Sequence, residues 1–199
     1  MIKLVHLPSI LIGFRFVIAP LLLVDALDSN TSWFFVFGYI LAVLSDIFDG
    51  IIARHLKVST VQLRQADSWA DICLYLCVAM STWLVFPQVL IDFQIPLLLG
   101  IAAQLSLFSI SLIKFGKFPS FHTYTAKLWG LTLLIATVSL FGFNYPHTLW
   151  LAIAFCWLNS LEEIIMVLVL SEWQCDNLSI FEVIKLRKTV IADSLSMDE

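Results

Sequence analysis

Four aspartates lie in or beside strongly apolar segments of this chain. They are Asp46, Asp49, Asp67 and Asp71. The first two are three residues apart and the last two are four apart, so on helices each pair would share one face. Ionisable residues in membrane-spanning segments are costly and usually functional. If both helices meet the same side of a membrane, the four carboxylates can converge.

Converging carboxylates repel one another strongly unless cations or protons intervene. Two divalent ions would balance four ionised carboxylates, and ligands that offer only oxygen suit hard ions such as Mg²⁺, Mn²⁺ or Ca²⁺. A pair of metal ions can clamp the attacking and leaving oxygens during displacement at phosphorus. The alternative is that these are ordinary aspartates at the membrane interface, which cap the ends of helices.

The composition indicates that lipid is the solvent for most of the chain. Of 199 residues, 60% are hydrophobic and 13% are charged, against about 45–50% and about 25% in a typical soluble domain. A bilayer-spanning helix needs about 20 mainly apolar residues. Six segments qualify: Pro8–Leu27, Trp33–Ala53, Asp67–Phe86, Phe93–Ile113, Tyr124–Phe143 and Thr148–Leu170. The sequence therefore predicts an all-α, polytopic membrane protein with about six transmembrane helices. Nothing in it resembles a nucleic-acid-binding surface.

The basic residues predict the orientation of these segments. They are Lys3, Arg15, Arg54, Lys57, Arg64, Lys114, Lys117, Lys127, Lys185, Arg187 and Lys188. All lie at the two termini, in the second-to-third and fourth-to-fifth connections, or at helix ends beside these. Because cytoplasmic loops carry the excess of Lys and Arg, we expect both termini and the aspartates on the cytoplasmic side. We expect one six-helix domain over residues 1–172 and a cytoplasmic tail over 173–199.

The aspartates also belong to a longer motif. The stretch Asp46-Ile47-Phe48-Asp49-Gly50-Ile51-Ile52-Ala53-Arg54, followed by Asp67 and Asp71, resembles the CDP-alcohol phosphotransferase (CDP-alcohol phosphatidyltransferase) family. The family motif is D-x2-D-G-x2-A-R-x8-G-x3-D-x3-D. Every fixed position matches except the second glycine, which is Leu63 here. That leucine could crowd the nucleotide pocket, so that the pocket is reshaped, the nucleotide differs or activity is lost.

The resemblance implies a role for each carboxylate. Asp46, Asp49 and Asp67 would be ligands of two divalent ions, Mg²⁺ or Mn²⁺, within a metal site formed by all four aspartates. Asp71 would also be the catalytic base that takes the proton from an acceptor alcohol. The metal ions would bind the pyrophosphate of a CDP-linked lipid, and CMP would leave.

Five further residues are candidates for substrate binding. Gly50 and Ala53 would leave room for the nucleotide, although close helix packing explains them equally well. Arg54 would contact phosphate or a motif carboxylate, unless it is only a positive-inside anchor. Arg15, about 10 Å into the first helix at 1.5 Å per residue, has substrate phosphate or a motif aspartate as plausible partners. Lys127 would attract an anionic acceptor head group, or merely anionic lipids.

The leading functional interpretation is a phosphatidyltransferase of phospholipid biosynthesis, which moves a phosphatidyl group from CDP-diacylglycerol to an alcohol. One alternative within the family is a CDP-choline or CDP-ethanolamine phosphotransferase. Alternatives outside it are a transporter that binds divalent cations and a catalytically silent scaffold. The membrane would be a bacterial inner membrane or an endomembrane, and the resemblance implies a homodimer.

Overall fold

The computed structural model describes residues 6–56, 60–117 and 123–170, and within these ranges the regular secondary structure is helical. It contains seven α-helices and no strand in the described ranges. Six of the helices are long and apolar enough to cross a membrane. These observations confirm the predicted all-α fold with six candidate spans.

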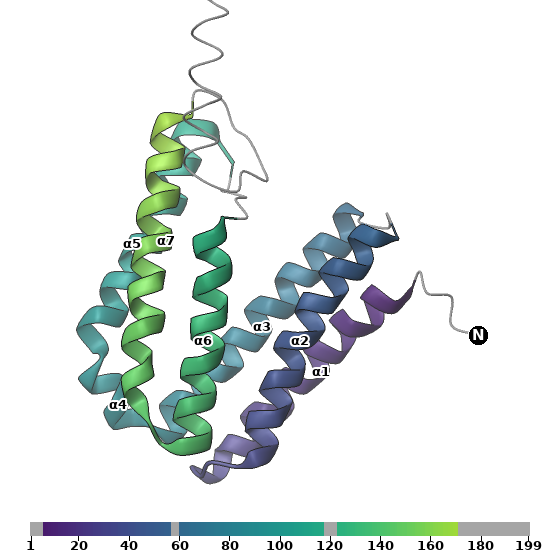
Figure 1. Ribbon diagram of the computed structural model, residues 1–199, viewed down its shortest axis with the longest axis vertical. Helices are drawn as coiled ribbons and strands as arrows, with labels where there is room; N and C mark the ends of the chain where they lie inside the picture. Colours follow the sequence, from purple (N-terminus) through teal and green to yellow (C-terminus); the bar gives the residue numbers. More distant parts are fainter. Residues whose placement is uncertain (1–5, 57–59, 118–122, 171–199) are drawn as a thin grey trace, which may run out of the picture. The chain divides into compact units, whose positions relative to one another are not determined.

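The elements follow the predicted order along the chain (Figure 1). They are α1 (Leu7–Asp25), the 3₁₀ turn η2 (Ala26–Asp28), α2 (Trp33–His55), α3 (Val61–Val85), α4 (Pro87–Asp92), α5 (Gln94–Phe115), α6 (Tyr124–Phe143), the 3₁₀ turn η3 (Pro146–Thr148) and α7 (Leu149–Val169).

The largest departures from the expected helices are the start of α3 and the presence of α4. Helix α3 begins at Val61, six residues before Asp67, because the hydroxyl of Thr60 caps it by accepting from the backbone N–H of Leu63 at 3.1 Å. Hydropathy finds only the apolar part of a helix, so it misses a polar first turn. The short helix α4 was not expected. It begins with Pro87, and proline is well suited to the first position of a helix.

The described helices fall into two compact units. The first spans Met1–Asp92 and Thr137–Pro146, and the second spans Phe93–Ala136 and His147–Glu199. Helices α1 to α4 and the end of α6 therefore belong to the first unit, and α5, the rest of α6 and α7 to the second. The tail predicted for residues 173–199 lies outside the described residues, and the domain boundary at 172 stays a prediction.

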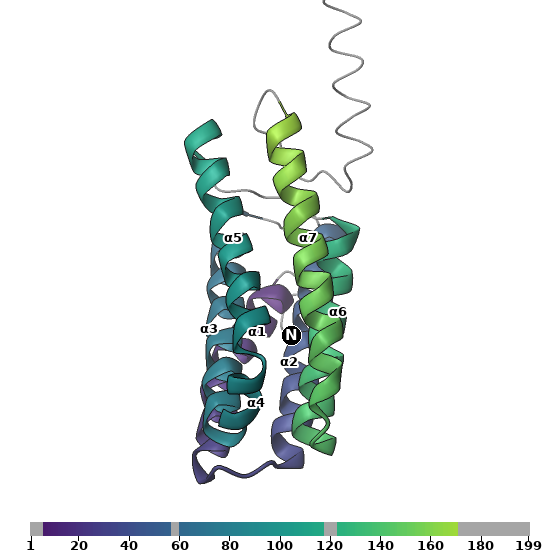
Figure 2. The same cartoon turned by 90° about the vertical axis from the view of Figure 1, so that its left-hand side faces the viewer.

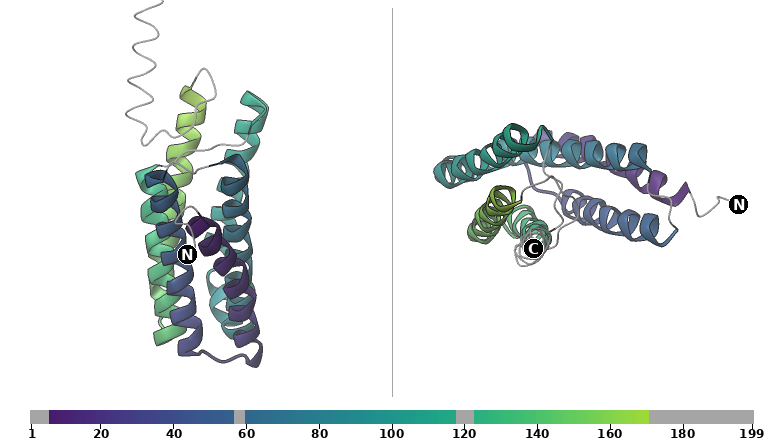
Figure 3. Two further views of the ribbon diagram at one scale, coloured as in Figure 1. Left: turned by 90° about the vertical axis from the view of Figure 1, so that its right-hand side faces the viewer. Right: turned by 90° about the horizontal axis from the view of Figure 1, so that it is seen from above.

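In the first unit, α1 packs against both α2 and α3 (Figures 1 and 3). The buried residues of α1 recur every three or four positions and so form one face of the helix. They are Pro8, Ile12, Arg15, Ile18, Ala19 and Leu22. Where this face meets α2, a Cβ atom added to Gly38 would lie 2.8 Å from Cδ2 of Leu22. The glycine therefore permits a close approach, which helps helices associate in lipid.

Aromatic rings hold the end of α6 in the first unit. Phe141 stacks on Phe35 of α2 with ring centroids 3.8 Å apart. Its ring also meets Phe86, the residue that ends α3, edge-on at 5.2 Å. Such pairs add to the free energy of simple area burial, so this three-ring cluster holds the end of α6 from Thr137 onward against α2 and the end of α3.

In the second unit, α5 packs along α7 (Figure 2) and polar side chains join the two helices. Gln104 Nε2 donates a hydrogen bond to Ser160 Oγ at 3.0 Å. Further along, Lys114 Nζ donates to the backbone carbonyls of Val167 and Leu168 at 2.9 and 2.8 Å. A cation is favourable at a helix C-terminus, where carbonyls lack intrahelical partners. Lys114 thus stabilises the end of α7.

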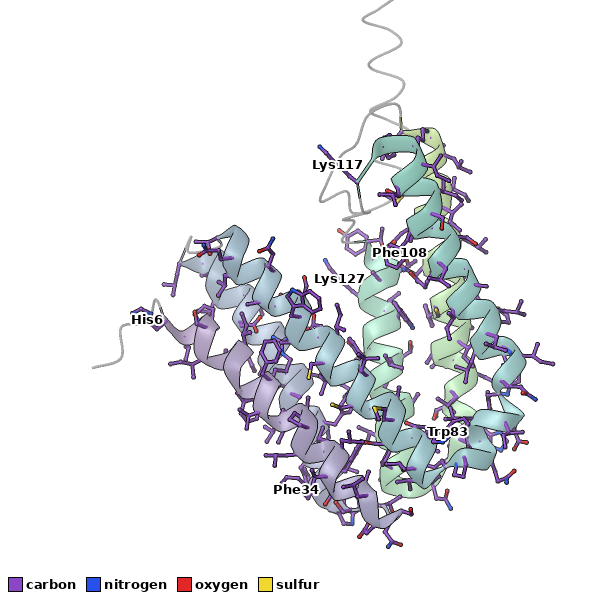
Figure 4. All side chains as sticks on the ribbon, turned by 180° about the vertical axis from the view of Figure 1, so that it is seen from behind. His6, Phe34, Trp83, Phe108, Lys117 and Lys127 are labelled. Carbon is purple, nitrogen blue, oxygen red and sulfur yellow. The ribbon has the colours of Figure 1, made fainter. Side chains whose placement is uncertain are left out.

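Large apolar side chains also cover the outside of the helices. Phe34, Trp83 and Phe108, labelled in Figure 4, are 52%, 62% and 41% exposed. Soluble proteins rarely expose large contiguous apolar patches, whereas lipid-facing helices are expected to carry them. The outer surface of the described helices therefore suits a bilayer.

We predict that Gly38→Leu destabilises the protein by about 1–3 kcal/mol, the usual cost of overpacking, because its side chain must displace the buried side chain of Leu22. Gly13→Leu is the matched control, since a Cβ atom there meets nothing within 4 Å. Thermal unfolding of the two variants in detergent measures the difference. Equal melting temperatures would show that α1 and α2 do not approach closely at Gly38.

Candidate active site

Arg15 of α1 lies among all four aspartates. Its Nη1 is 2.9 Å from Asp46 Oδ1 and donates a hydrogen bond to Asp71 Oδ1. Its Nη2 donates to Asp49 Oδ2 and is 3.1 Å from Asp67 Oδ1. The side chain of Arg15 is fully buried. One guanidinium therefore bridges the carboxylates of two other helices.

The helix geometry explains why these groups meet. Asp46 and Asp49 lie in the second half of α2, and Asp67 and Asp71 lie in the second and third turns of α3. Residues three or four apart on a helix share a face, and the buried face of α1 that carries Arg15 packs against both helices. The site thus lies where α2 ends and α3 begins.

The carboxylates differ in depth. The side chain of Asp49 is only 4% exposed, whereas those of Asp46, Asp67 and Asp71 are 34–38% exposed. Asp49 forms the buried floor of the site, and the other three carboxylates can be reached from outside. A ligand would therefore meet these three first.

A single guanidinium does not balance four ionised carboxylates, so the site retains an excess of negative charge that favours cations. Oxygens of Asp46, Asp49 and Asp67 all lie within 4.8 Å of one another. A cation bound at about 2.0–2.6 Å from each oxygen fits that separation. The donor set consists of carboxylate oxygens only, which suits hard divalent ions such as Mg²⁺ and Mn²⁺. These residues therefore fit the predicted metal site.

The hydrogen bonding of Arg15 is incomplete. Its Nε is buried and has no hydrogen-bond partner among the described residues. A buried donor without a partner costs free energy comparable to a lost hydrogen bond. The guanidinium is thus held by charge at its two terminal nitrogens while its third donor position is unsatisfied.

Leu63 lies in the first turn of α3 and is half-buried. It precedes Asp67 by four residues, so the two side chains share a face of the helix. The one departure from the family motif therefore stands beside a carboxylate of the site, where side-chain volume can affect a ligand.

The other predicted substrate-binding residues are less fully described. Gly50 follows Asp49 in α2 and is half-buried. Ala53 and Arg54 lie near the end of α2, but their side chains are outside the described part of the structure. Lys127 is exposed near the start of α6, in the second unit, with Nζ 5.2 Å from the centroid of the Tyr124 ring (Figure 4). Substrate binding by these four residues stays a prediction.

The second unit contains a polar cluster that includes Asn159 and Glu162, two polar residues within an apolar segment of the sequence. Thr123 Oγ1 donates to the buried Asn159 Oδ1 at 2.9 Å. Thr125 Oγ1 lies 3.1 Å from the same oxygen and 2.5 Å from Glu162 Oε2. The cluster joins the start of α6 to α7. The sequence marks Asn159 and Glu162 as candidates for hydrogen bonds to a neighbouring helix. It does not identify their partners, because Thr123 and Thr125 are of a residue type that commonly caps helices.

The fold and the site define an integral membrane protein whose spanning helices carry a carboxylate cluster able to bind cations. A family model for CDP-alcohol phosphatidyltransferases matches residues 5–173, a range that includes all six candidate spans and the four aspartates. The chain belongs to the CDP-alcohol phosphatidyltransferase family, whose members are transferases that act in phospholipid synthesis. No curated protein and no solved structure gives a significant match.

Proposed function

We propose that this protein transfers a phosphatidyl group from CDP-diacylglycerol to an alcohol and releases CMP. The observation that carries the proposal is the convergence of Asp46, Asp49, Asp67 and Asp71 around one buried guanidinium. Such a concentration of carboxylates in membrane-spanning helices is expensive unless cations bind there. Family membership supplies the class of reaction.

Each carboxylate has a task in this reaction. Asp46, Asp49 and Asp67 hold the divalent ions, which when bound supply positive charge to the pyrophosphate and to the CMP that leaves. Asp71 accepts the hydroxyl proton of the acceptor as the alcohol oxygen bonds to the phosphorus that carries diacylglycerol. The bond from that phosphorus to CMP breaks in the same displacement. Asp71 is 34% exposed, so an alcohol can reach it.

The assignment of Asp71 as the base answers a chemical need. An alcohol is a weak nucleophile at neutral pH, and a positioned base contributes typically about 10²–10⁴-fold to a rate. Asp49, being the most buried of the four, is poorly placed to meet a substrate and better placed to hold an ion.

Further proposals concern the surroundings of the enzyme. Two divalent ions, Mg²⁺ or Mn²⁺, are the proposed cofactors, and the lipid bilayer and a second copy of the chain are proposed partners. The distribution of basic residues supports a site that faces the cytoplasm.

The direct test is to incubate the purified protein with radiolabelled CDP-diacylglycerol, Mg²⁺ or Mn²⁺, and a panel of alcohols. CMP release with one acceptor supports the proposal and identifies that acceptor. Release only from CDP-choline or CDP-ethanolamine with diacylglycerol would move the protein to the alternative reaction. Nucleotide binding without release from any donor would support the silent scaffold, which Leu63 motivates.

We predict that Asp71→Asn lowers turnover by about 10²–10⁴-fold, because the amide cannot accept the proton. Binding of Mn²⁺ and CDP persists, since the other three carboxylates remain. Isothermal titration separates these quantities from the CMP-release rate. Unchanged turnover would remove Asp71 as the base.

We predict that Leu63→Gly leaves CDP affinity unchanged or raises it, because the side chain stands where the family has glycine. Glycine also costs a helix about 1 kcal/mol relative to alanine, so Leu63→Ala is the control for side-chain volume alone. The measurement is CDP titration in the presence of Mn²⁺. A sharp loss of affinity in both variants would mean that the leucine shapes the pocket.

We predict that His55, the last residue of α2, faces the cytoplasm. We predict that Tyr145, which follows the C-terminal end of α6, lies on the other side of the membrane. Single cysteines at these positions are introduced after the four native cysteines are replaced. In intact cells a membrane-impermeant maleimide should label Tyr145→Cys but not His55→Cys. His55→Cys should be labelled only after the membrane is permeabilised. The opposite pattern would invert the proposed orientation.

A further inference from the structure

Arg15 contacts the same carboxylates that form the candidate metal site. Asp46, Asp49 and Asp67, whose oxygens lie within 4.8 Å of one another, each meet one of its terminal nitrogens. A cation held by these three oxygens would lie among them, where the guanidinium already is. Two cations that close together also repel, and the repulsion is strong where water is scarce. The contacts of Arg15 and full metal occupancy therefore exclude each other.

The hydrogen bonding of Arg15 indicates where its guanidinium could go when cations bind the carboxylates. Arg15 Nε has no partner among the described residues, so the observed position does not satisfy every donor. A guanidinium can bind a phosphate through two parallel hydrogen bonds. A phosphate group beside the carboxylates would therefore offer Arg15 acceptors of the required charge once cations took over the aspartates.

We propose that Arg15 is an internal counter-ion that competes with divalent cations for the four carboxylates, and that metal binding frees its guanidinium to pair with a substrate phosphate. The proposal rests on the proposed function for the identity of the phosphate, although the competition itself does not need a reaction. It implies an order of events in which cations bind before the nucleotide.

The test compares Mn²⁺ binding by the wild-type protein and two variants without nucleotide, by isothermal titration or by the electron paramagnetic resonance signal of free Mn²⁺. Arg15→Gln removes the charge and keeps much of the side-chain length. We expect it to bind Mn²⁺ at least about tenfold more tightly, since an adjacent positive charge is lost. Arg15→Lys keeps the positive charge, but its single ammonium nitrogen cannot bridge several carboxylates as the two terminal nitrogens of a guanidinium do. We expect its affinity to lie between those of Arg15→Gln and the wild type.

Two controls separate competition from other effects. Lys114→Gln removes one positive charge from the side chain that caps α7, and we expect the dissociation constant for Mn²⁺ to stay unchanged. If Arg15→Gln is unstable without metal, the rise in melting temperature on adding Mn²⁺ replaces titration. That rise should exceed the rise seen in the wild type at the same Mn²⁺ concentration, because stabilisation by a ligand grows with the logarithm of its concentration divided by its dissociation constant.

The second part of the proposal has its own measurement. With Mn²⁺ saturating, CDP should bind Arg15→Gln at least about tenfold more weakly than the wild type, because a bidentate charge-assisted pair is lost. Unchanged CDP affinity would overturn the transfer of Arg15 to phosphate.

The outcomes also distinguish this proposal from the function it builds on. If the wild type binds Mn²⁺ and releases CMP but Arg15→Gln binds Mn²⁺ no more tightly, competition is wrong and the enzyme assignment stands. If the wild type and Arg15→Gln both bind neither Mn²⁺ nor Mg²⁺, the metal-dependent function is itself wrong and the competition with it. Equal affinities of Arg15→Lys and the wild type would mean that charge alone, and not the bridging geometry, controls metal binding.

Discussion

The structure of the first unit depends on a charge balance within membrane-spanning helices. Four carboxylates from α2 and α3 meet within two candidate membrane spans, and a fully buried guanidinium from α1 joins them. Breaking a buried charge pair by removing one partner is strongly destabilising, even though forming the pair is not a large net gain. The arginine and the aspartates therefore constrain one another, and three helices must pack closely to satisfy both.

Small residues make that packing possible. Gly38 allows Leu22 of α1 to approach α2, and Ala42 and Ala70 are fully buried on α2 and α3 close to the aspartates. In lipid, apolar burial does not drive helices together as it does in water, so close contact and polar contacts must. The first unit uses both: its small residues bring the backbones together and its charges hold one end.

Membership of the CDP-alcohol phosphatidyltransferase family explains why the protein retains such a cluster, and Leu63 shows what it has changed. All four carboxylates of the motif are present, whereas the residue that differs is a glycine replaced by a leucine. The negative charge of this site and the space available to a ligand are thus set by different residues. The leucine side chain shares a helix face with Asp67, so its effect falls on the shape of the site while the charges that attract cations remain.

The sequence by itself determined the helices and the residues of the site, because apolar length and carboxylate spacing are local properties of the chain. It located six spans and placed Asp46 beside Asp49, and Asp67 beside Asp71, although it missed the polar first turn of α3 and the whole of α4. Only the tertiary structure decided which groups meet across helices. That Arg15 contacts all four aspartates depends on how α1 packs against α2 and α3, and the packing is set jointly by many side chains. The threonines that join Asn159 were hidden for the same reason: a hydrogen bond between distant residues leaves no periodic signal in the sequence.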